Sequence, residues 1–151
     1  MNLQAGVFLN STPALDDTDF SGAVIFISEY NERGAVGYVV NRPFGRSLNE
    51  LEEFKHDTPL PLYDGGPVDR EHLFFLHRRP DLIAGGAGAG NGLYSGGDFR
   101  GALAALRKGQ LPAGDLKVFI GYCGWDGGEL EAEIAEGSWT VSEEPADAVF
   151  R

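Results

Sequence analysis

The chain has 151 residues, which is the size of one ordinary domain, and 42% of them are hydrophobic, enough to build a core. Its 23 acidic residues outnumber the 12 lysines and arginines, so the formal net charge is −11 at pH 7. This charge disfavours direct nucleic-acid binding and attachment to an anionic membrane, because both usually depend on many basic side chains.

The first third of the chain alternates strand-like and loop-like segments. Residues 3–9 are predicted as a first strand, and residues 23–30 and 35–40, which are rich in β-branched and aromatic side chains, as the next two. Residues 10–19 are polar and acidic and are predicted as a loop. The short segment between the second and third strands ends in Gly34, which can take the positive φ that closes a hairpin. These two strands are therefore predicted to pair.

A short helix is predicted after the third strand. Ser47 is followed three residues later by Glu50, and this capping-box pattern satisfies two free N–H groups at a helix start. Leu48, Leu51 and Phe54 would give the helix one apolar stripe.

The middle of the chain predicts two more strands and a loop. Residues 60–63 and 72–77 are apolar and aromatic and flank a turn at residues 64–67. The glycine-rich stretch from Gly85 to Gly97 is interpreted as a flexible or tightly turned loop.

The last third predicts two helices and two strands. A helix is predicted over residues 98–108 with Asp98 as its N-cap, and another opens at Asp126 with Glu129 completing a capping box. Residues 117–123 and 139–141 are predicted as strands, and the last ten residues are expected to be loosely held.

These elements predict one domain over residues 1–151. Hairpins mixed with single helices favour an α+β or mixed-sheet fold, because no regular strand–helix–strand alternation runs along the chain. No signal peptide or apolar run near 18 residues is visible, and the single Cys123 cannot form a disulfide within the chain. We therefore expect a cytoplasmic location and no membrane contact.

Cofactor and metal motifs do not match the sequence. The glycine-rich stretch lacks the Gly-Lys-Ser/Thr of a phosphate loop and the spacing of a dinucleotide fingerprint. His72 and His77 lie five residues apart in a predicted strand, so their side chains point to opposite faces. Asp16, Asp17 and Asp19 lack the spacing of a calcium loop. No cofactor or metal is predicted.

Cys123 is the one candidate nucleophile. It lies where a predicted strand leads into a predicted helix, which is the setting of a nucleophile elbow, and His77 would be its base. The alternative is a small, buried, inert side chain, because free cysteine is among the most buried residue types. We favour the alternative and assign no catalytic residue.

Arg42 is the candidate for holding an anion. Pro43 restricts it to an extended backbone and so fixes where the guanidinium leaves the sheet. The competing interpretation, which we favour, is a structural ion pair with one of the many acids. A second charged feature is residues 126–147, which hold eight acids and no lysine or arginine; this is a solvated face or, less favoured, a docking surface for a basic partner.

Several segments in register resemble the AlgH/YqgE family of bacterial proteins. They are SEYNERGAVG at residues 28–37, VVNRP at 39–43, YDGGPV at 63–68, LH at 76–77, GYCGW at 121–125, and GELE at 128–131 with Glu133. The resemblance implies an α+β fold with a mixed, bifurcated and partly barrel-like sheet surrounded by a few helices. It also implies that Cys123 replaces a small residue such as Ala or Ser, which weakens the thiol-enzyme hypothesis.

No catalytic residues are agreed for that family, whose name comes from a proposed regulator of alginate production. We therefore predict a non-enzymatic regulatory or interaction protein that contacts an unidentified protein partner or small ligand. The alternative is a small-molecule-binding protein or hydrolase with a cleft near Arg42, Cys123 and Trp125, although Trp125 is favoured as a core residue. The candidate ligand-binding residues are Asn41, Arg42, Gly65, Gly66, His77, Tyr122, Cys123, Trp125 and Glu129.

Overall fold

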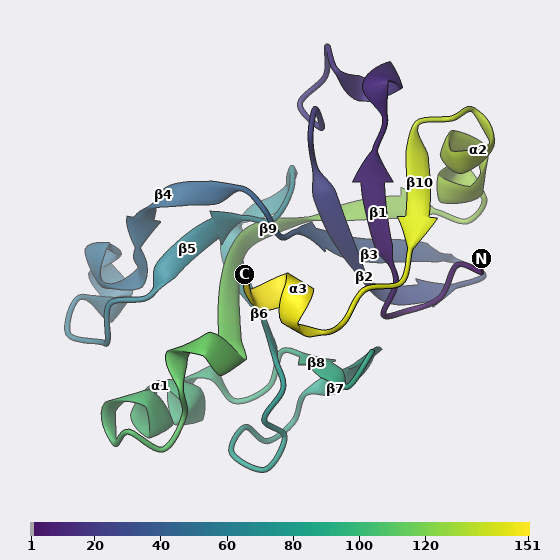
Figure 1. The fold of residues 1–151 in the computed structure, drawn as a ribbon. Coiled ribbons are helices and arrows are strands. Elements are labelled where there is room, and N and C mark those ends of the chain that lie inside the picture. The colour runs from purple at the N-terminus through teal and green to yellow at the C-terminus, as the bar shows by residue number, and fades with distance from the viewer. Residues whose placement is uncertain (1) are drawn as a thin grey trace.

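Residues 2–151, which the computed structural model describes, form one ten-stranded sheet with three α-helices around it (Figure 1). The α+β fold class is thus confirmed. The strands are β1 (Phe8–Ser11), β2 (Val24–Asn31), β3 (Gly34–Val39), β4 (Pro43–Ser47), β5 (Pro61–Asp64), β6 (Val68–His77), β7 (Ala87–Gly90), β8 (Leu93–Ser95), β9 (Leu116–Asp126) and β10 (Trp139–Ser142). The helices are α1 (Phe99–Arg107), α2 (Glu129–Ala135) and α3 (Asp147–Phe150).

Strand β9 is the branch point of the sheet. Along the main path the strands lie in the order β10-β1-β2-β3-β9-β6-β8-β7, while β5 pairs with β9 outside this path and carries β4. The β5–β9 pair is parallel and the other pairs are antiparallel. The sheet is therefore mixed and bifurcated, as the family resemblance implies, but it stays open and does not close into a barrel.

Glycine backbone forms the crossing at this branch. An added Cβ would lie 2.4 Å from Gly121 O if placed on Gly65, and 2.3 Å from Tyr122 C and O if placed on Gly66. Gly66 also has a φ of 151° and Gly121 a φ of 72°, which side chains disfavour. The Gly65 N–H donates to Ile120 O at 2.9 Å. The two chain segments can approach this closely only because Gly65, Gly66 and Gly121 carry no side chains.

A large bulge in β6 follows the crossing. Val68 pairs with Tyr122 and Leu73 pairs with Ile120, so the five-residue step on β6 faces a two-residue step on β9. Residues 69–72 are exposed and stand out from the ladder, and Asp69 has a φ of 52°. Bulges of this kind re-aim side chains away from the regular sheet.

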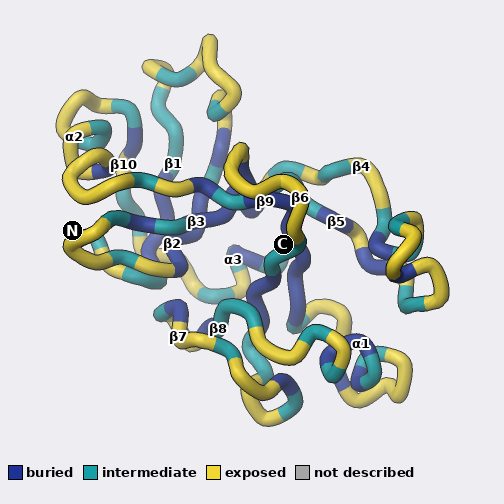
Figure 2. Tube along the Cα trace, turned by 180° about the vertical axis from the view of Figure 1, so that it is seen from behind, coloured by how far each residue is buried: buried dark blue, intermediate teal, exposed yellow. Residues whose placement is uncertain are grey.

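Both faces of the sheet are covered. Alternate residues of its central strands point to opposite sides and pack into different clusters. On β2, Ile25 and Ile27 pack under α2, whereas Phe26 packs toward α3. A third cluster joins α1 to β5, β6 and β9. Figure 2 shows the buried segments at the centre of the molecule and the exposed segments in its loops.

The C-terminal residues are fixed to the core, so the expected loose end was wrong. Val149 of α3 is fully buried. The buried Lys117 donates from Nζ to the carbonyl oxygens of Val40 at 2.6 Å and Val149 at 2.8 Å. Its Nζ also lies 3.9 Å from the centre of the Tyr63 ring, and burial lowers the pKa of Lys117 to about 8. No such contact is visible in the local sequence.

Other local predictions have mixed outcomes. The β2–β3 hairpin and the helix capped by Asp98 are confirmed, with Asp98 accepting the Gly101 N–H at 3.0 Å. The prediction of a glycine-rich loop was wrong, since this stretch forms the antiparallel β7–β8 pair. The first strand begins at Phe8 and not at Leu3.

Two predicted helix starts also differ. The capping box of Ser47 and Glu50 is present, but it opens two 3-10 turns, Leu48–Glu50 and Glu52–Phe54, in place of an α-helix. Strand β9 continues to Asp126, and α2 starts only at Glu129 after Gly128, whose φ is 88°. No helix among residues 2–151 is long and apolar enough to span a membrane.

Replacing Gly66 by alanine is expected to lower the free energy of unfolding by about 3 kcal/mol, because both the backbone contact and the positive φ penalise a Cβ. Gly88→Ala is the matched control, since a Cβ there would meet no atom within 4 Å and φ is not positive. Urea denaturation measures both variants. Equal midpoints for Gly66→Ala and the unchanged protein would contradict the role of the crossing.

Candidate functional site

The predicted site residues do not share one place. Arg42 and Gly66 line a cleft of about 510 Å³ together with Asp19, Phe20, Asp64, Pro67 and Arg70; we call it the Arg42 cleft. Gly65 is buried beside it at the glycine crossing. The other predicted residues lie outside the lining of this cleft.

Asn41 has a structural role next to Arg42. Its Oδ1 accepts the Val24 N–H at 3.0 Å, and its Nδ2 donates to Gly22 O at 2.9 Å. The side chain thus ties the residue before Arg42 to the loop that precedes β2. Arg42 itself makes no ion pair within residues 2–151, so the expected structural ion pair was wrong.

Cys123 is not at a strand end, so the nucleophile-elbow setting was wrong. Strand β9 continues three residues beyond it, to Asp126. The thiol is 2% exposed, and its Sγ lies 3.5 Å from Gly65 O. Burial raises the pKa of Cys123 to about 12, although the nearby Arg42 partly opposes this effect. A thiol in this position stays protonated at neutral pH and is a poor nucleophile.

His77 is buried and too far away to assist Cys123. It pairs with Leu116, seven residues before Cys123 along β9, which corresponds to roughly 23 Å of extended strand. Its Nδ1 accepts the Arg79 N–H at 3.1 Å, and its Nε2 lies 3.2 Å from Gly96 O. These two contacts fit the neutral ring with its proton on Nε2. Burial lowers the pKa of His77.

Trp125 and Glu129 lie at the opposite end of β9. The Trp125 indole N–H donates to Glu133 Oε1 at 3.1 Å, and the same oxygen accepts the Trp139 N–H at 2.9 Å. The half-buried Trp125 packs against the core under α2. Glu129 accepts the Asp126 N–H at 2.5 Å, which tethers the start of α2 to the end of β9.

Tyr122 points to the other face of β9 from Cys123. Its ring packs edge-on against Phe74, with 5.3 Å between the ring centres, in the cluster that also contains Val149 of α3. Tyr122 and Cys123, adjacent in sequence, therefore serve different cores.

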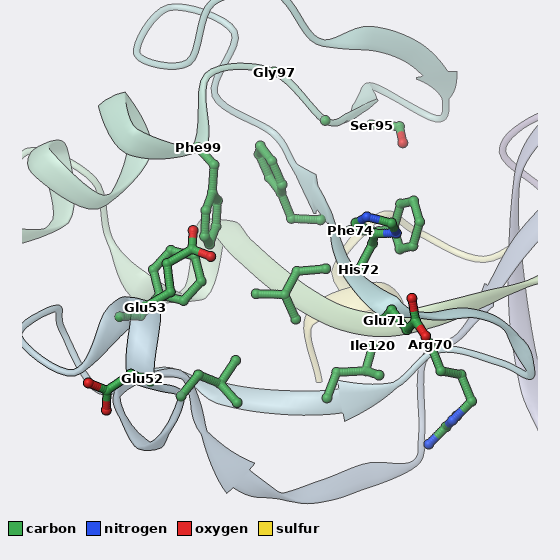
Figure 3. Close-up of a pocket in the computed structure, with 15 residues that line it drawn as sticks. Glu52, Glu53, Arg70, Glu71, His72, Phe74, Ser95, Gly97, Phe99 and Ile120 are labelled. Carbon is green, nitrogen blue, oxygen red and sulfur yellow. The ribbon is translucent and has the colours of Figure 1, made fainter.

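A second cavity, which the sequence did not indicate, has a volume of about 730 Å³ and is shown in Figure 3. We call it the apolar groove. It lies between the 3-10 turns, the bulged half of β6, and the start of α1. Its floor consists of Leu51, Phe54, Leu73, Phe74, Phe75, Phe99 and Ile120. The Phe99 ring is central, with ring centres 5.6 Å from Phe54 and 5.0 Å from Phe75.

The rim of the apolar groove is mainly acidic. Glu52, Glu53 and Glu71 supply three carboxylates, whereas Arg70 supplies one guanidinium. Arg70 is itself held by Asp64 at 2.5 Å, and in Figure 3 its side chain leads away from the aromatic floor.

The charged groups of the rim differ in how closely they are paired. Glu52 pairs with Lys55 at 2.9 Å and Glu53 pairs loosely with Arg100 at 3.4 Å, while Glu71 has no ion pair within the described residues. His72 Nδ1 lies 2.6 Å from Asp69 Oδ1, and this hydrogen bond raises the pKa of His72. Glu71 is thus the rim charge left open to a ligand.

Sequence reasoning missed the groove because its floor residues have the pattern of a core. Leu51 and Phe54 were assigned to the buried stripe of a helix, and Leu73 and Phe75 to a buried strand. The available signal was the polar run at residues 69–72, which interrupts strand β6 and marks the bulge. Within residues 2–151, no group of three His, Cys, Asp or Glu side chains is placed to hold a metal ion.

Comparisons with known proteins agree with the resemblance seen in the sequence. A family model described as AlgH-like matches residues 8–151. A UPF0301 protein of Chlorobium phaeobacteroides is 35% identical over 148 residues, which cover 98% of this chain and 79% of the relative. A UPF0301 protein of Bacteroides fragilis is 36% identical over 140 residues, which cover 92% of this chain and 71% of the relative.

Two solved structures share the fold. The solution structure of the AlgH protein from Pseudomonas aeruginosa has a TM-score of 0.76 at 28% identity, and the match covers 99% of this chain and 85% of that one. The crystal structure of a protein from Corynebacterium diphtheriae has a TM-score of 0.74 at 23% identity, covering 97% and 80%. At that identity the second match shows likeness of fold alone.

Cys123 is expected to resist iodoacetamide in the native protein. With a pKa of about 12, about one thiol in 10,000 is ionised at about pH 8, and the side chain is also shielded from the reagent. The same protein in urea is the control and should be labelled fully. Mass spectrometry measures the modified fraction, and rapid labelling of the native protein would restore the nucleophile hypothesis.

His77 should make stability depend on pH below its ordinary pKa of 6.5. Because the folded pKa is lowered, the stabilisation is present above pH 6.5 and is lost as the pH falls toward the folded value. Protonated Nδ1 can no longer accept the Arg79 N–H. NMR titration of the ring, with urea midpoints above and below pH 6.5, checks this. His56→Gln, which removes a different histidine, is the control. A pKa of 6.5 or above for the His77 ring in the NMR titration would contradict the prediction.

Proposed function

The chain belongs to the AlgH-like family, and we propose that it is a non-enzymatic cytoplasmic interaction protein whose apolar groove binds a basic, partly apolar segment of a partner protein. The observation that carries this proposal is the groove itself, an apolar floor of about 730 Å³ under a rim with three carboxylates. Its volume lies within the range of ordinary ligand sites.

The floor supplies the binding energy in this proposal. Large aromatic side chains dominate interface energetics, and the ring of Phe99 stands between those of Phe54 and Phe75. An apolar side chain of the partner that covers these rings would remove them from water. Each such anchor contributes on the order of 1.5–3 kcal/mol before the cost of ordering the segment is subtracted.

The charges favour a basic segment. Glu71 has no ion pair among the described residues, and the exposed Glu52 and Glu53 are only partly neutralised by Lys55 and Arg100. The net charge of −11 adds a long-range attraction for basic partners. Such complementarity raises association rates and sets specificity more than it adds affinity.

A role in binding fits the groups that lie outside the groove. An enzyme mechanism would need the protonated Cys123 and the neutral His77 to share one site. Cys123 lies on β9, whereas His77 lies on β6 beside Leu116 at the start of β9, and neither lines the groove. A contact with a regulatory protein would also give the chain a regulatory role without direct DNA binding, which its charge disfavours.

The test selects peptides from a phage-displayed random library on the immobilised protein and measures fluorescent copies by anisotropy. We expect selected peptides to combine large apolar residues with Lys or Arg. Changing those basic residues to Glu should weaken binding by about tenfold or more, equivalent to about 1.4 kcal/mol.

Two groove variants should weaken the binding of the same peptides by a similar factor. Glu71→Lys reverses the open rim charge, and Leu73→Gln places an amide in the floor. The matched controls are Glu143→Lys, which reverses an exposed charge, and Val68→Gln, which changes a residue that is 38% exposed; both residues lie outside the groove lining. Peptides without apolar or basic residues, or binding that survives both groove variants, would overturn the proposal.

A further inference from the structure

The Arg42 cleft contains one free positive charge and one free negative charge, and we infer that it binds a small zwitterion, namely a free amino acid with an apolar side chain. This site is separate from the apolar groove and does not depend on the function proposed for it. The argument rests on which charged groups of the cleft are already paired and which are not.

Arg42 is held in place by its backbone while its guanidinium stays unpaired. Its carbonyl accepts the Asp64 N–H at 2.8 Å, and Pro43 after it restricts it to extended φ and ψ. The side chain is half-buried and forms no ion pair or side-chain hydrogen bond within residues 2–151. A fixed guanidinium in a cleft is well suited to bind a carboxylate through two parallel hydrogen bonds.

The second arginine of the cleft is already engaged. Arg70 Nη1 donates to Asp64 Oδ1 at 2.5 Å and to Gly66 O at 2.9 Å. Arg70 and Asp64 therefore neutralise one another and form a fixed wall. Arg42 is left as the cation of the cleft that has no partner in residues 2–151.

Asp19 supplies the corresponding free carboxylate. It is exposed on the loop between β1 and β2, lines the same cleft as Arg42, and is not within ion-pair distance of it. The two opposite charges therefore line one cleft with more than 4.0 Å between their nitrogen and oxygen atoms. A carboxylate bound to Arg42 and an ammonium group bound to Asp19 would neutralise both.

The remaining lining selects the rest of the ligand. Phe20 and Pro67 are apolar walls, so a ligand side chain lying against them would be apolar as well. The volume of about 510 Å³ is ample for one amino acid. A phosphate dianion is a poor occupant, because Arg42 is the one unpaired cation of the cleft among the described residues and the carboxylate of Asp19 would repel the two negative charges.

The experiment measures thermal shifts of the full chain with each standard amino acid, followed by calorimetry on those that stabilise it. For each of these, the amide removes the carboxylate and the N-acetyl derivative removes the ammonium group. We expect at least one apolar amino acid to bind, and both derivatives to bind about tenfold more weakly or worse.

Arg42→Gln and Asp19→Asn should each abolish the shift. Arg46→Gln and Asp17→Asn are matched controls. Arg46 lies four residues after Arg42 and Asp17 two residues before Asp19, and both are exposed and lie outside the cleft lining. Urea denaturation confirms that each variant is folded. Absence of any shift with every amino acid, or a shift that survives both cleft variants, would overturn the inference. An Arg42-dependent shift that acetate or phosphate produces equally well would also overturn it, since that marks a plain anion site.

Discussion

The structure depends on the close contact between the Gly65–Gly66 backbone and the backbone of β9 around Gly121. Here the sheet branches, because β9 leaves its pairing with β5 and β6 and turns to pair with β3. A Cβ at any of these three glycines would lie within 2.4 Å of a backbone atom of the other segment. The contact therefore admits only glycine and fixes how the two halves of the sheet are joined.

Both cavities follow from this crossing. Gly66 and Pro67 line the Arg42 cleft, and the chain then enters the bulge of β6, whose residues 70–72 line the apolar groove. Arg70 borders both cavities and is bonded back to Asp64 and to Gly66 O. A bulge stores backbone strain, seen in the positive φ of Asp69, and such strain is commonly found at functional sites. The two candidate binding regions are thus neighbours because one turn and one bulge build both.

The sequence predicted those elements whose signals are local. The β2–β3 hairpin follows from strand composition around Gly34, and α1 from the Asp98 cap, since both depend on residues a few positions apart. The β7–β8 pair was missed although Asn91 and Gly92 form an Asn-Gly turn with positive φ at both residues, because the surrounding glycines suggested a loop. That α3 is fixed to the core could not be predicted from its local sequence, since its position depends on the distant Lys117 and its buried carbonyl partners.

Only part of the candidate cleft had a local signal in the sequence. Pro43 marked Arg42 and the predicted turn marked Gly66, and both line the Arg42 cleft, whereas Asn41 lies outside its lining. The motif at residues 121–125 was misleading because alternate residues of β9 face opposite cores, so Tyr122 and Cys123 cannot serve one pocket. The groove was missed because the sequence spacing of Phe99 and Leu73 is the same for a residue covered by another part of the chain and for one that faces water. Periodicity reports which face of an element is apolar, whereas a binding site is an apolar face that the rest of the chain leaves uncovered.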